Sequence, residues 1–412
     1  MAPMDERPLS ADRRIQAGGV FLNAVARIWR LILLVLVFQA PTLAGAGPAA
    51  AQQSGSVYTV SGVAVDRTAD TAAAAREQAL AAGHVAAFGR LLDRIVPRDR
   101  RGALPALDTA AIAPLVLSFG IDEEKASDVR YLARLTFQFR RNEVREFLRA
   151  QGVAVAETRS KPALVLPVYS EVGALALWDD PNPWFAAWKR LPPPDGLVPL
   201  RVPAGDLADI RDISAEQAAR GEEAPLQKIS ERYGVSGVIV ARAAFVIDPG
   251  TGRRALSVAT SRSGRALGDR TAVRSFLLED GETVEAVCAR AARSLAVEIE
   301  EDWKNENLLR FDRQGELIAV LAVNDLRSWV SVRSRIREVA ALRQSQMVSA
   351  SRDRIVVRLS YYGDAEQLRV ALAQKDLVLE QGAVNWILRE AGDDAGENAG
   401  EGAAPQGDGG AR

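Results

Sequence analysis

The stretch ERYGVSGVIVARAAFVIDPGTGRR, residues 231–254, decides the fold of the middle of this chain. Its residues 235–247 form a nearly continuous apolar run rich in β-branched side chains, which predicts the strongest strand of the chain. Gly234 stands where the end of a helix favours a left-handed residue. Residues 248–252, DPGTG, have the composition of a tight turn. We therefore expect a helix, a central strand and a reversal into a second strand.

Segments on both sides of this stretch predict a module of strands and helices over residues 161–308. Its N-terminal boundary is placed at Lys161-Pro162, because the residue before a proline is biased toward extended structure. Alternating or continuous apolar runs predict the strands, and residues that favour helix caps predict the helices. The expected strands are 163–169, 197–202, 235–247, 255–260 and 271–278, and the expected helices follow Ser214, cover 225–233 and follow Thr283.

A module of similar type is expected over residues 55–160. Apolar residues alternate at both ends of this segment, as in half-buried strands, and recur at helical spacing between them. The expected elements are a strand over 57–65, a helix over 71–95 capped by Asp70, a helix over 110–118, a strand over 129–139 and a helix over 142–150.

The third module, residues 315–390, is expected to have βαββαβ order, which is typical of a ferredoxin-like split motif. Aspartates at its two helix starts match the preference for short polar caps. The expected elements are a strand over 317–323, a helix from the Asp325 cap to residue 340, strands over 346–350 and 354–361, a helix over 365–374 after Gly363-Asp364, and a strand over 384–388. The predicted fold class is therefore α+β, with three small α/β modules in series.

The two ends of the chain are expected to lie outside these modules. Arg13, Arg14, Arg27 and Arg30 precede an apolar run over 31–38 and a small-residue segment that ends at Ala51. This order is typical of a secretory signal peptide over residues 1–51, either cleaved after Ala51 or retained as an N-terminal anchor. The tail, 391–412, is glycine-rich and polar and is expected to be disordered. We expect the protein in the periplasm.

Overall charge excludes one broad class of function. Lys and Arg together number 52 and Asp and Glu 53, which gives a net charge of −1. A nearly neutral chain has no bulk field to attract nucleic acid or an anionic membrane surface. We therefore expect no nucleic-acid partner, and contact with a membrane only through a retained signal segment.

The most unusual stretch, residues 177–210, is rich in both proline and tryptophan. Trp184 and Trp188 stand one helical turn apart, and Trp178 precedes them. Exposed aromatic side chains bind sugar faces and partner proteins, whereas buried ones contribute large apolar areas to a core. The stretch is therefore expected either to anchor the sheet of the second module or to present tryptophan to a ligand, and solvent exposure distinguishes the two.

Acidic residues in the same stretch have two interpretations. Asp179, Asp180 and Asn182 offer the oxygen ligands of a hard cation, but their spacing matches no calcium loop, and the acids are expected to cap the following helix. Asp206 and Asp209, with Asp212 three residues further, are expected side by side at a solvated helix start, or as an acid–base pair. The candidate binding surface is Trp178, Asp179, Asp180, Trp184, Trp188, Asp206 and Asp209.

The single histidine and the single cysteine are expected to be structural. His84 lies on the apolar stripe of the helix over 71–95, without a second histidine or a cysteine that would complete a metal site. Cys288 falls on an apolar helix face and lacks a nearby activating base. No catalytic residue, metal ligand or cofactor is assigned, and the chain is expected not to be an enzyme.

Two resemblances extend this interpretation. The segment over 231–254 and the strands and helix after it resemble the N-terminal domain of the periplasmic translocation protein TolB, over about 163–303. That resemblance implies partner binding without chemistry. The segments LVLPVYSEVGALALWDDPNPWFAAWKR, GLVPLRVPAGDLADI and LSYYGDAEQLRVALAQKDLVL are similar to an uncharacterised family of bacterial envelope proteins, a domain of unknown function (DUF2066). The likeness implies compartment and architecture only.

The functional expectation is an exported, non-enzymatic protein that acts by protein–protein contact in the assembly or maintenance of the cell envelope, with envelope proteins as partners. The alternative is a periplasmic carboxylate-dependent hydrolase or sugar-binding protein. In that alternative the residues involved are Asp179, Asp180, Asp206 and Asp209 beside Trp178, Trp184 and Trp188.

Overall fold

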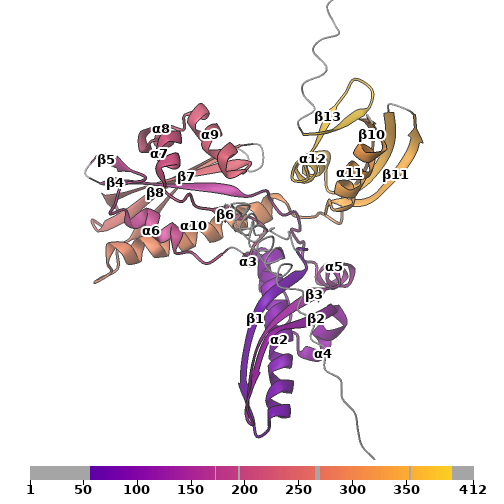
Figure 1. Cartoon of the computed structure of the whole chain (residues 1–412), viewed down its shortest axis with the longest axis horizontal. Coiled ribbons are helices and arrows are strands. Elements are labelled where there is room, and N and C mark those ends of the chain that lie inside the picture. The colour runs from indigo at the N-terminus through magenta and orange to yellow at the C-terminus, as the bar shows by residue number, and fades with distance from the viewer. Residues whose placement is uncertain are drawn as a thin grey trace, which may run out of the picture. The chain divides into compact units, whose positions relative to one another are not determined.

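The computed structural model describes residues 56–391 except 172, 194, 265–269, 324 and 352–353. All of these residues belong to one compact unit. The described residues form helices and three β-sheets, which confirms the α+β class (Figure 1). The expected signal peptide and all of the expected tail after residue 391 lie outside the described residues.

The first sheet is three-stranded and antiparallel, in the order β1-β3-β2, and the long helix α2 packs against it. Buried side chains of α2 and of strand β3 interleave in the core, as their helical and alternating patterns predict. Its elements are β1 (Thr59–Thr68), α2 (Ala72–Ile95), α3 (Arg98–Arg101), α4 (Thr109–Ile112), η1 (Ala113–Leu115), β2 (Val116–Ala126), β3 (Arg130–Phe139) and α5 (Arg141–Ala150).

Two expectations for this module are wrong. The helix over 110–118 is only the single turn α4 followed by η1, after which the chain becomes the eleven-residue strand β2. As an edge strand, β2 exposes nearly all of its side chains, so its sequence lacks the apolar alternation that identifies a half-buried strand. The cap of α2 is Thr71 instead of Asp70, since the Thr71 hydroxyl accepts the Ala74 N–H.

The second sheet has the order β5-β4-β7-β8-β9, with β6 paired to one end of β4. Strands β4 and β7 are parallel, and β7, β8 and β9 form an antiparallel meander. The strands are β4 (Ala163–Glu171), β5 (Ala174–Ala176), β6 (Leu200–Arg201), β7 (Gly237–Ile247), β8 (Arg254–Ser263) and β9 (Arg270–Leu277). The helices are α6 (Pro183–Lys189), α7 (Leu207–Asp212), α8 (Ala215–Arg220), α9 (Glu223–Tyr233) and α10 (Val284–Glu306).

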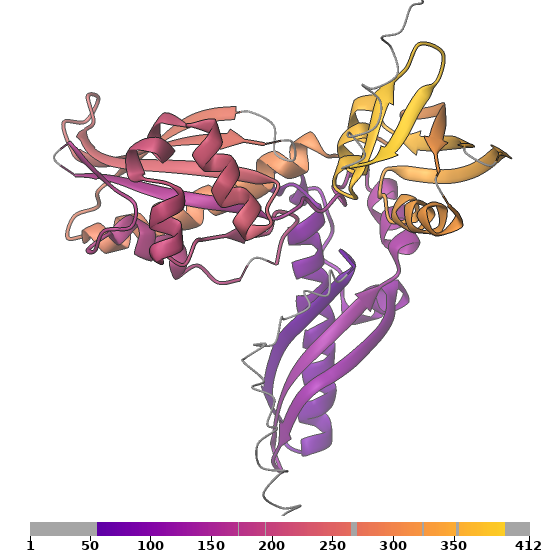
Figure 2. The same ribbon diagram turned by 45° about the horizontal axis from the view of Figure 1, so that its top comes forward.

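Both faces of this sheet are covered, so β4 and the first half of β7 are buried on both sides. One core lies between the sheet and helices α6 and α10, and the other lies between the sheet and helices α8 and α9 (Figure 1 and Figure 2). The prediction of a strand over residues 235–247 is confirmed over Gly237–Ile247, with Gly234 left-handed at φ 58° as the helix end requires.

The third sheet has the order β11-β12-β10-β14-β13. The observed element order is βαββαββ, so the expected βαββαβ order missed one strand, β13, which forms an antiparallel hairpin with β14. Only five residues long, β13 follows its helix after three residues and gives no separate periodic signal. The elements are β10 (Gln314–Ala322), α11 (Leu326–Arg337), β11 (Leu342–Ala350), β12 (Arg354–Tyr362), α12 (Ala365–Ala373), β13 (Leu377–Gln381) and β14 (Trp386–Glu390).

In the described part of the chain, no helix is both long enough and apolar enough to cross a bilayer.

Candidate contact surface and pocket

Trp184 and Trp188 lie in the core of the second module and not on a surface. Their exposed fractions are 0% and 2%, their rings meet edge to face at 5.7 Å, and both belong to the cluster between α6, α10 and the sheet. The Trp184 indole N–H donates to the Ala241 carbonyl of the central strand at 2.8 Å. Of the two interpretations of this stretch, the structure therefore supports the anchoring role for these tryptophans, and they are removed from the candidate binding surface.

Trp178 is only half-buried, and its surroundings differ. Its indole N–H donates to the Ile213 carbonyl at 2.8 Å, and its ring meets the half-buried ring of Phe185 edge to face at 6.0 Å. Gly205 lies on these two rings, since a β-carbon at that position would stand 3.4 Å from Phe185 and 3.8 Å from Trp178. The two aromatic rings thus support the segment that leads into α7.

The side chain of Asp209 is fully buried and is held by four donors. It accepts the backbone N–H groups of Gly205 at 2.7 Å and Asp206 at 3.2 Å, and the Tyr233 hydroxyl at 3.0 Å. Its other oxygen pairs with the Arg232 guanidinium. Asp206 in turn caps the helix by accepting the Ala208 and Asp209 N–H groups, so the two acids form a capping box. A carboxylate with this set of donors is positioned to fix α7 and not to move protons.

Asp212, at the end of α7, is 5% exposed and pairs with two cations of α9. Its carboxylate contacts the Lys228 ammonium at 3.0 Å and the Arg232 guanidinium. The pairing with Lys228 and then that with Arg232 hold the pKa of Asp212 below its usual value. Burial lowers the pKa of Arg232, but its hydrogen bonds to Asp209 and Asp212 outweigh that effect, so the net change is a raised pKa. The expected solvated helix start is therefore wrong for Asp209 and Asp212, because the cations of α9 draw both acids inward.

As a result, α7 has its apolar side chains on the outside. Leu207 is 85% exposed and Ile210 is 50% exposed, while the two acids on the opposite face are buried. Burying a leucine or isoleucine side chain is worth about 1.5–3 kcal/mol, which this helix forgoes at two positions. We call the set Trp178, Phe185, Leu207 and Ile210 the α7 surface.

The remaining acids of the predicted set are exposed. Asp179 and Asp180 lie on the surface beside Trp178, and Asp206 is exposed at the start of α7. Neither Asp179 nor Asp180 caps α6, because the side chain that accepts the Phe185 N–H is that of Asn182. The structure thus keeps Trp178, Asp179, Asp180 and Asp206 at the surface and places Trp184, Trp188 and Asp209 in the interior.

The surroundings of His84 and Cys288 indicate a structural role for each. The His84 ring packs edge to face on Phe137 at 4.9 Å and on Phe119 at 5.6 Å, with Nδ1 2.8 Å from the Leu80 carbonyl. Cys288 is fully buried, and burial, followed by the charges of Glu285 and Glu282, raises the pKa of its thiol to about 12. Among the described residues, no group of three or more His, Cys, Asp or Glu side chains is arranged to hold a metal ion.

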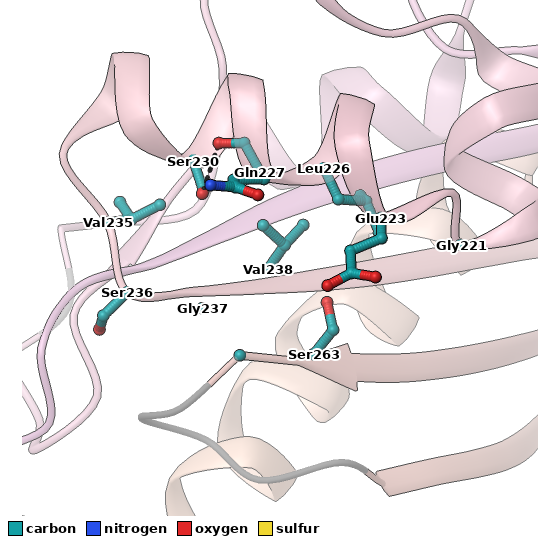
Figure 3. A pocket seen from close by; sticks show the side chains of 11 residues that line it. Gly221, Glu223, Leu226, Gln227, Ser230, Val235, Ser236, Gly237, Val238 and Ser263 are labelled. Carbon is teal, nitrogen blue, oxygen red and sulfur yellow. Dashed lines mark hydrogen bonds between the residues drawn. The ribbon is translucent and has the colours of Figure 1, made fainter. Parts of the chain in front are cut away.

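A separate open pocket of about 890 Å³ lies beside α9, at the start of β7 and the end of β8 (Figure 3). Its polar lining comes from Glu223, Gln227 and Ser230 of α9, from Ser236 and from Ser263. Leu226, Val235 and Val238 supply apolar lining. Sequence reasoning missed this pocket, because its residues come from three elements that only the fold brings together.

The inversion of α7, in which its acids are buried and its apolar side chains face solvent, has a signal in the sequence. Leu207 and Ile210 are three residues apart, and so are Asp209 and Asp212, so only one pair can face inward. Lys228 and Arg232, four residues apart in α9, offer two cations on one helix face. Two acids and two cations, each pair about one helical turn apart, can face each other, which indicates that the acids of α7 are the buried pair.

A comparison with the models of known protein families gives no match, and no curated protein matches the chain significantly.

Proposed function

We propose that this chain is a non-enzymatic binding protein that contacts a partner protein of the cell envelope through the α7 surface. The observation that carries the proposal is the inversion of α7. Buried ion pairs hold this six-residue helix rigidly while its leucine and isoleucine point to solvent. Pre-ordered apolar side chains lose little conformational entropy on binding, so they are suited to contact with a partner.

The charge around the α7 surface indicates what kind of partner it fits. Asp179 and Asp180 follow Trp178 in the chain and Asp206 precedes Leu207, and all three are exposed, so they form an acidic border to this surface. The neighbouring cations have partners of their own, since Lys189 donates to the Ala204 carbonyl at 3.1 Å and lies over the Phe185 ring at 5.4 Å. Arg211 lies 3.7 Å from Asp212, and Arg232 lies 4.0 Å from Asp206. An apolar surface with an acidic border favours a protein segment in which apolar residues are flanked by lysine or arginine. The same border disfavours an anionic lipid surface.

The remaining features of the proposal rest on the sequence. The signal-peptide pattern over residues 1–51 supports a periplasmic location. The resemblance to the TolB N-terminal domain and to the uncharacterised envelope family supports an adaptor role. We also propose that the third module is a ferredoxin-like split motif, because its order βαββαββ is the βαββαβ order with one further strand.

Site-specific photocrosslinking tests the proposal. A photoreactive amino acid is placed at Leu207 or at Ile210 in the full-length protein in living cells. The matched control position is Leu326, which is 76% exposed, is the first residue of α11, and follows an aspartate cap as Leu207 does.

We expect one protein to crosslink from both α7 positions and not from Leu326, through a segment with apolar residues and basic flanks. Equal products from all three positions would contradict it. Products that contain only lipid, or only a second copy of this chain, would also contradict it.

A further inference from the structure

We propose that the pocket beside α9 binds an alkylammonium group, such as the side chain of a lysine in a peptide. The pocket is defined by residues of α9, by the start of β7 and by the end of β8 (Figure 3). It does not share a residue with the α7 surface, so this inference goes beyond the proposed function. It rests on the charge, the hydroxyl groups and the apolar residues of the pocket.

A single charge lines the described part of the pocket, and it is negative. Glu223 is the only ionisable residue among the lining residues, and it has no hydrogen-bond or ion-pair partner among the described residues. The two cations of α9, Lys228 and Arg232, are bound to the acids of α7. The pocket therefore favours a cation over an anion.

One hydroxyl group, that of Ser263, stands opposite this carboxylate, and that of Ser230 lies about two turns further along α9. Figure 3 shows the Ser263 hydroxyl and the Glu223 carboxylate facing each other from the two walls. Ser230 donates its hydroxyl proton to the Gln227 carbonyl at 2.8 Å, which leaves its oxygen able to accept. An ammonium group carries three N–H donors and no acceptor. The Glu223 carboxylate and the Ser263 hydroxyl oxygen are therefore matching acceptors for one ammonium group.

The apolar residues of the pocket fit the rest of such a ligand. Leu226, Val235 and Val238 lie among the lining residues, where they would contact an aliphatic stem. A volume of about 890 Å³ exceeds one lysine side chain and leaves room for neighbouring peptide groups.

The wall at the end of β8 is held by close backbone contact. Gly264 has a φ of 115°, and a β-carbon there would stand 2.6 Å from the Ser236 carbonyl oxygen and 2.8 Å from the Gly237 α-carbon. Only glycine fits such a position. The wall that carries Ser263 is therefore formed before a ligand arrives.

Calorimetric titration of the full-length protein at low ionic strength tests the assignment. The probe is the peptide acetyl-Gly-Lys-Gly-amide. The same peptide with norleucine in place of lysine keeps the stem and removes the charge, and cadaverine supplies the amine without the peptide. The variants are Glu223→Gln and, as a matched control, Glu143→Gln, because Glu143 also stands exposed in the first turn of a helix, α5.

We expect saturable binding of the lysine peptide, loss of binding with norleucine, and an affinity about fivefold lower in Glu223→Gln. Glu143→Gln is expected to bind as the native protein does. Cadaverine that binds as tightly as the peptide assigns the pocket to free amines, and weaker cadaverine binding assigns it to peptides. The proposal is overturned if norleucine binds equally well, if the two glutamine variants behave alike, or if the lysine peptide shows no saturable binding.

A double variant separates this result from the function of the α7 surface. Leu207→Ser with Ile210→Ser is expected to leave lysine-peptide binding unchanged. A loss of peptide binding in that variant would contradict an independent pocket.

Discussion

At the scale of single residues, the two tryptophans of α6 differ in hydrogen bonding although both are buried. The Trp184 N–H donates to the Ala241 carbonyl, whereas the Trp188 N–H is buried without an acceptor among the described residues. Trp184→Phe loses a hydrogen bond and Trp188→Phe does not. We expect Trp184→Phe to lower the free energy of unfolding by about 1 kcal/mol more than Trp188→Phe, as measured by urea denaturation. Equal losses would contradict this difference.

Cys288 gives a second prediction at this scale. Its thiol is fully buried and has a pKa of about 12, so almost no reactive thiolate is present at neutral pH. A thiol reagent is expected to label the native protein at the rate of global or local unfolding, and the urea-unfolded protein at the rate of an ordinary cysteine. Labelling of the native protein as fast as the unfolded protein would show that the thiol is accessible.

Several helix caps were predictable from the sequence, because a cap depends only on residues close by in the chain. Ser214, Thr283, Asp325 and Asp364 each accept the N–H group three residues on, as expected of helix caps. The burial of Asp209 was not predictable from its own helix, because it depends on Arg232, which is 23 residues further along the chain. From its charge alone, Asp209 is expected in solvent. Its pairing with Arg232 explains why it is buried instead.

At the scale of elements, the position of α7 depends on a charge that acid removes. The pKa of Asp212 is lowered in the folded protein, first by Lys228 and then by Arg232, so its stabilising contribution is complete above its unfolded value. That contribution is lost as the pH falls from about 4 through the lowered folded pKa. We expect Asp212→Asn to be less stable than the native protein at pH 7, and the difference to shrink as the pH is lowered toward 2. A difference that is independent of pH would contradict the ion pair.

Elements with their own periodic signal were predicted, and elements that depend on a neighbour were not. The central strand β7 and the long helices α2 and α10 appear close to their expected bounds. The edge strand β2 buries few of its side chains and the strand β13 is only five residues long, so both are fixed by pairing with β3 and β14. The pocket beside α9 has the same origin, since pairing of β7 with β8 brings Val238 next to Ser263.

At the scale of the whole molecule, buried polar groups join segments that are far apart in the sequence. The Lys304 side chain is almost fully buried in α10, and its ammonium donates to the Asp93 carbonyl of α2 and contacts Glu301 at 2.8 Å. Glu157 is likewise buried between Arg141 and Arg145, and Arg145 also donates to the Ala340 carbonyl at 3.0 Å. Such contacts couple the stability of the segments that they join.

Replacement of the Lys304 ammonium tests this coupling. Lys304→Met keeps the stem and leaves buried carbonyl groups without a donor, so the free energy of unfolding is expected to fall by about 2 kcal/mol. Lys125→Met, on an exposed strand position, serves as the control and is expected to change stability by less than about 0.5 kcal/mol. Urea denaturation followed by circular dichroism measures both. Equal, small effects would show that Lys304 does not join α10 to α2.

The most direct test of the account is the affinity of the α7 surface for the partner that crosslinks to it, measured by calorimetry with purified proteins. The double variant Leu207→Ser with Ile210→Ser is compared with Leu326→Ser. Because all three side chains are exposed, both variants are expected to unfold within about 0.5 kcal/mol of the native protein. We expect the double variant to bind at least about tenfold more weakly, which corresponds to about 1.4 kcal/mol, and Leu326→Ser to bind as the native protein does. Unchanged affinity in a folded double variant would contradict it.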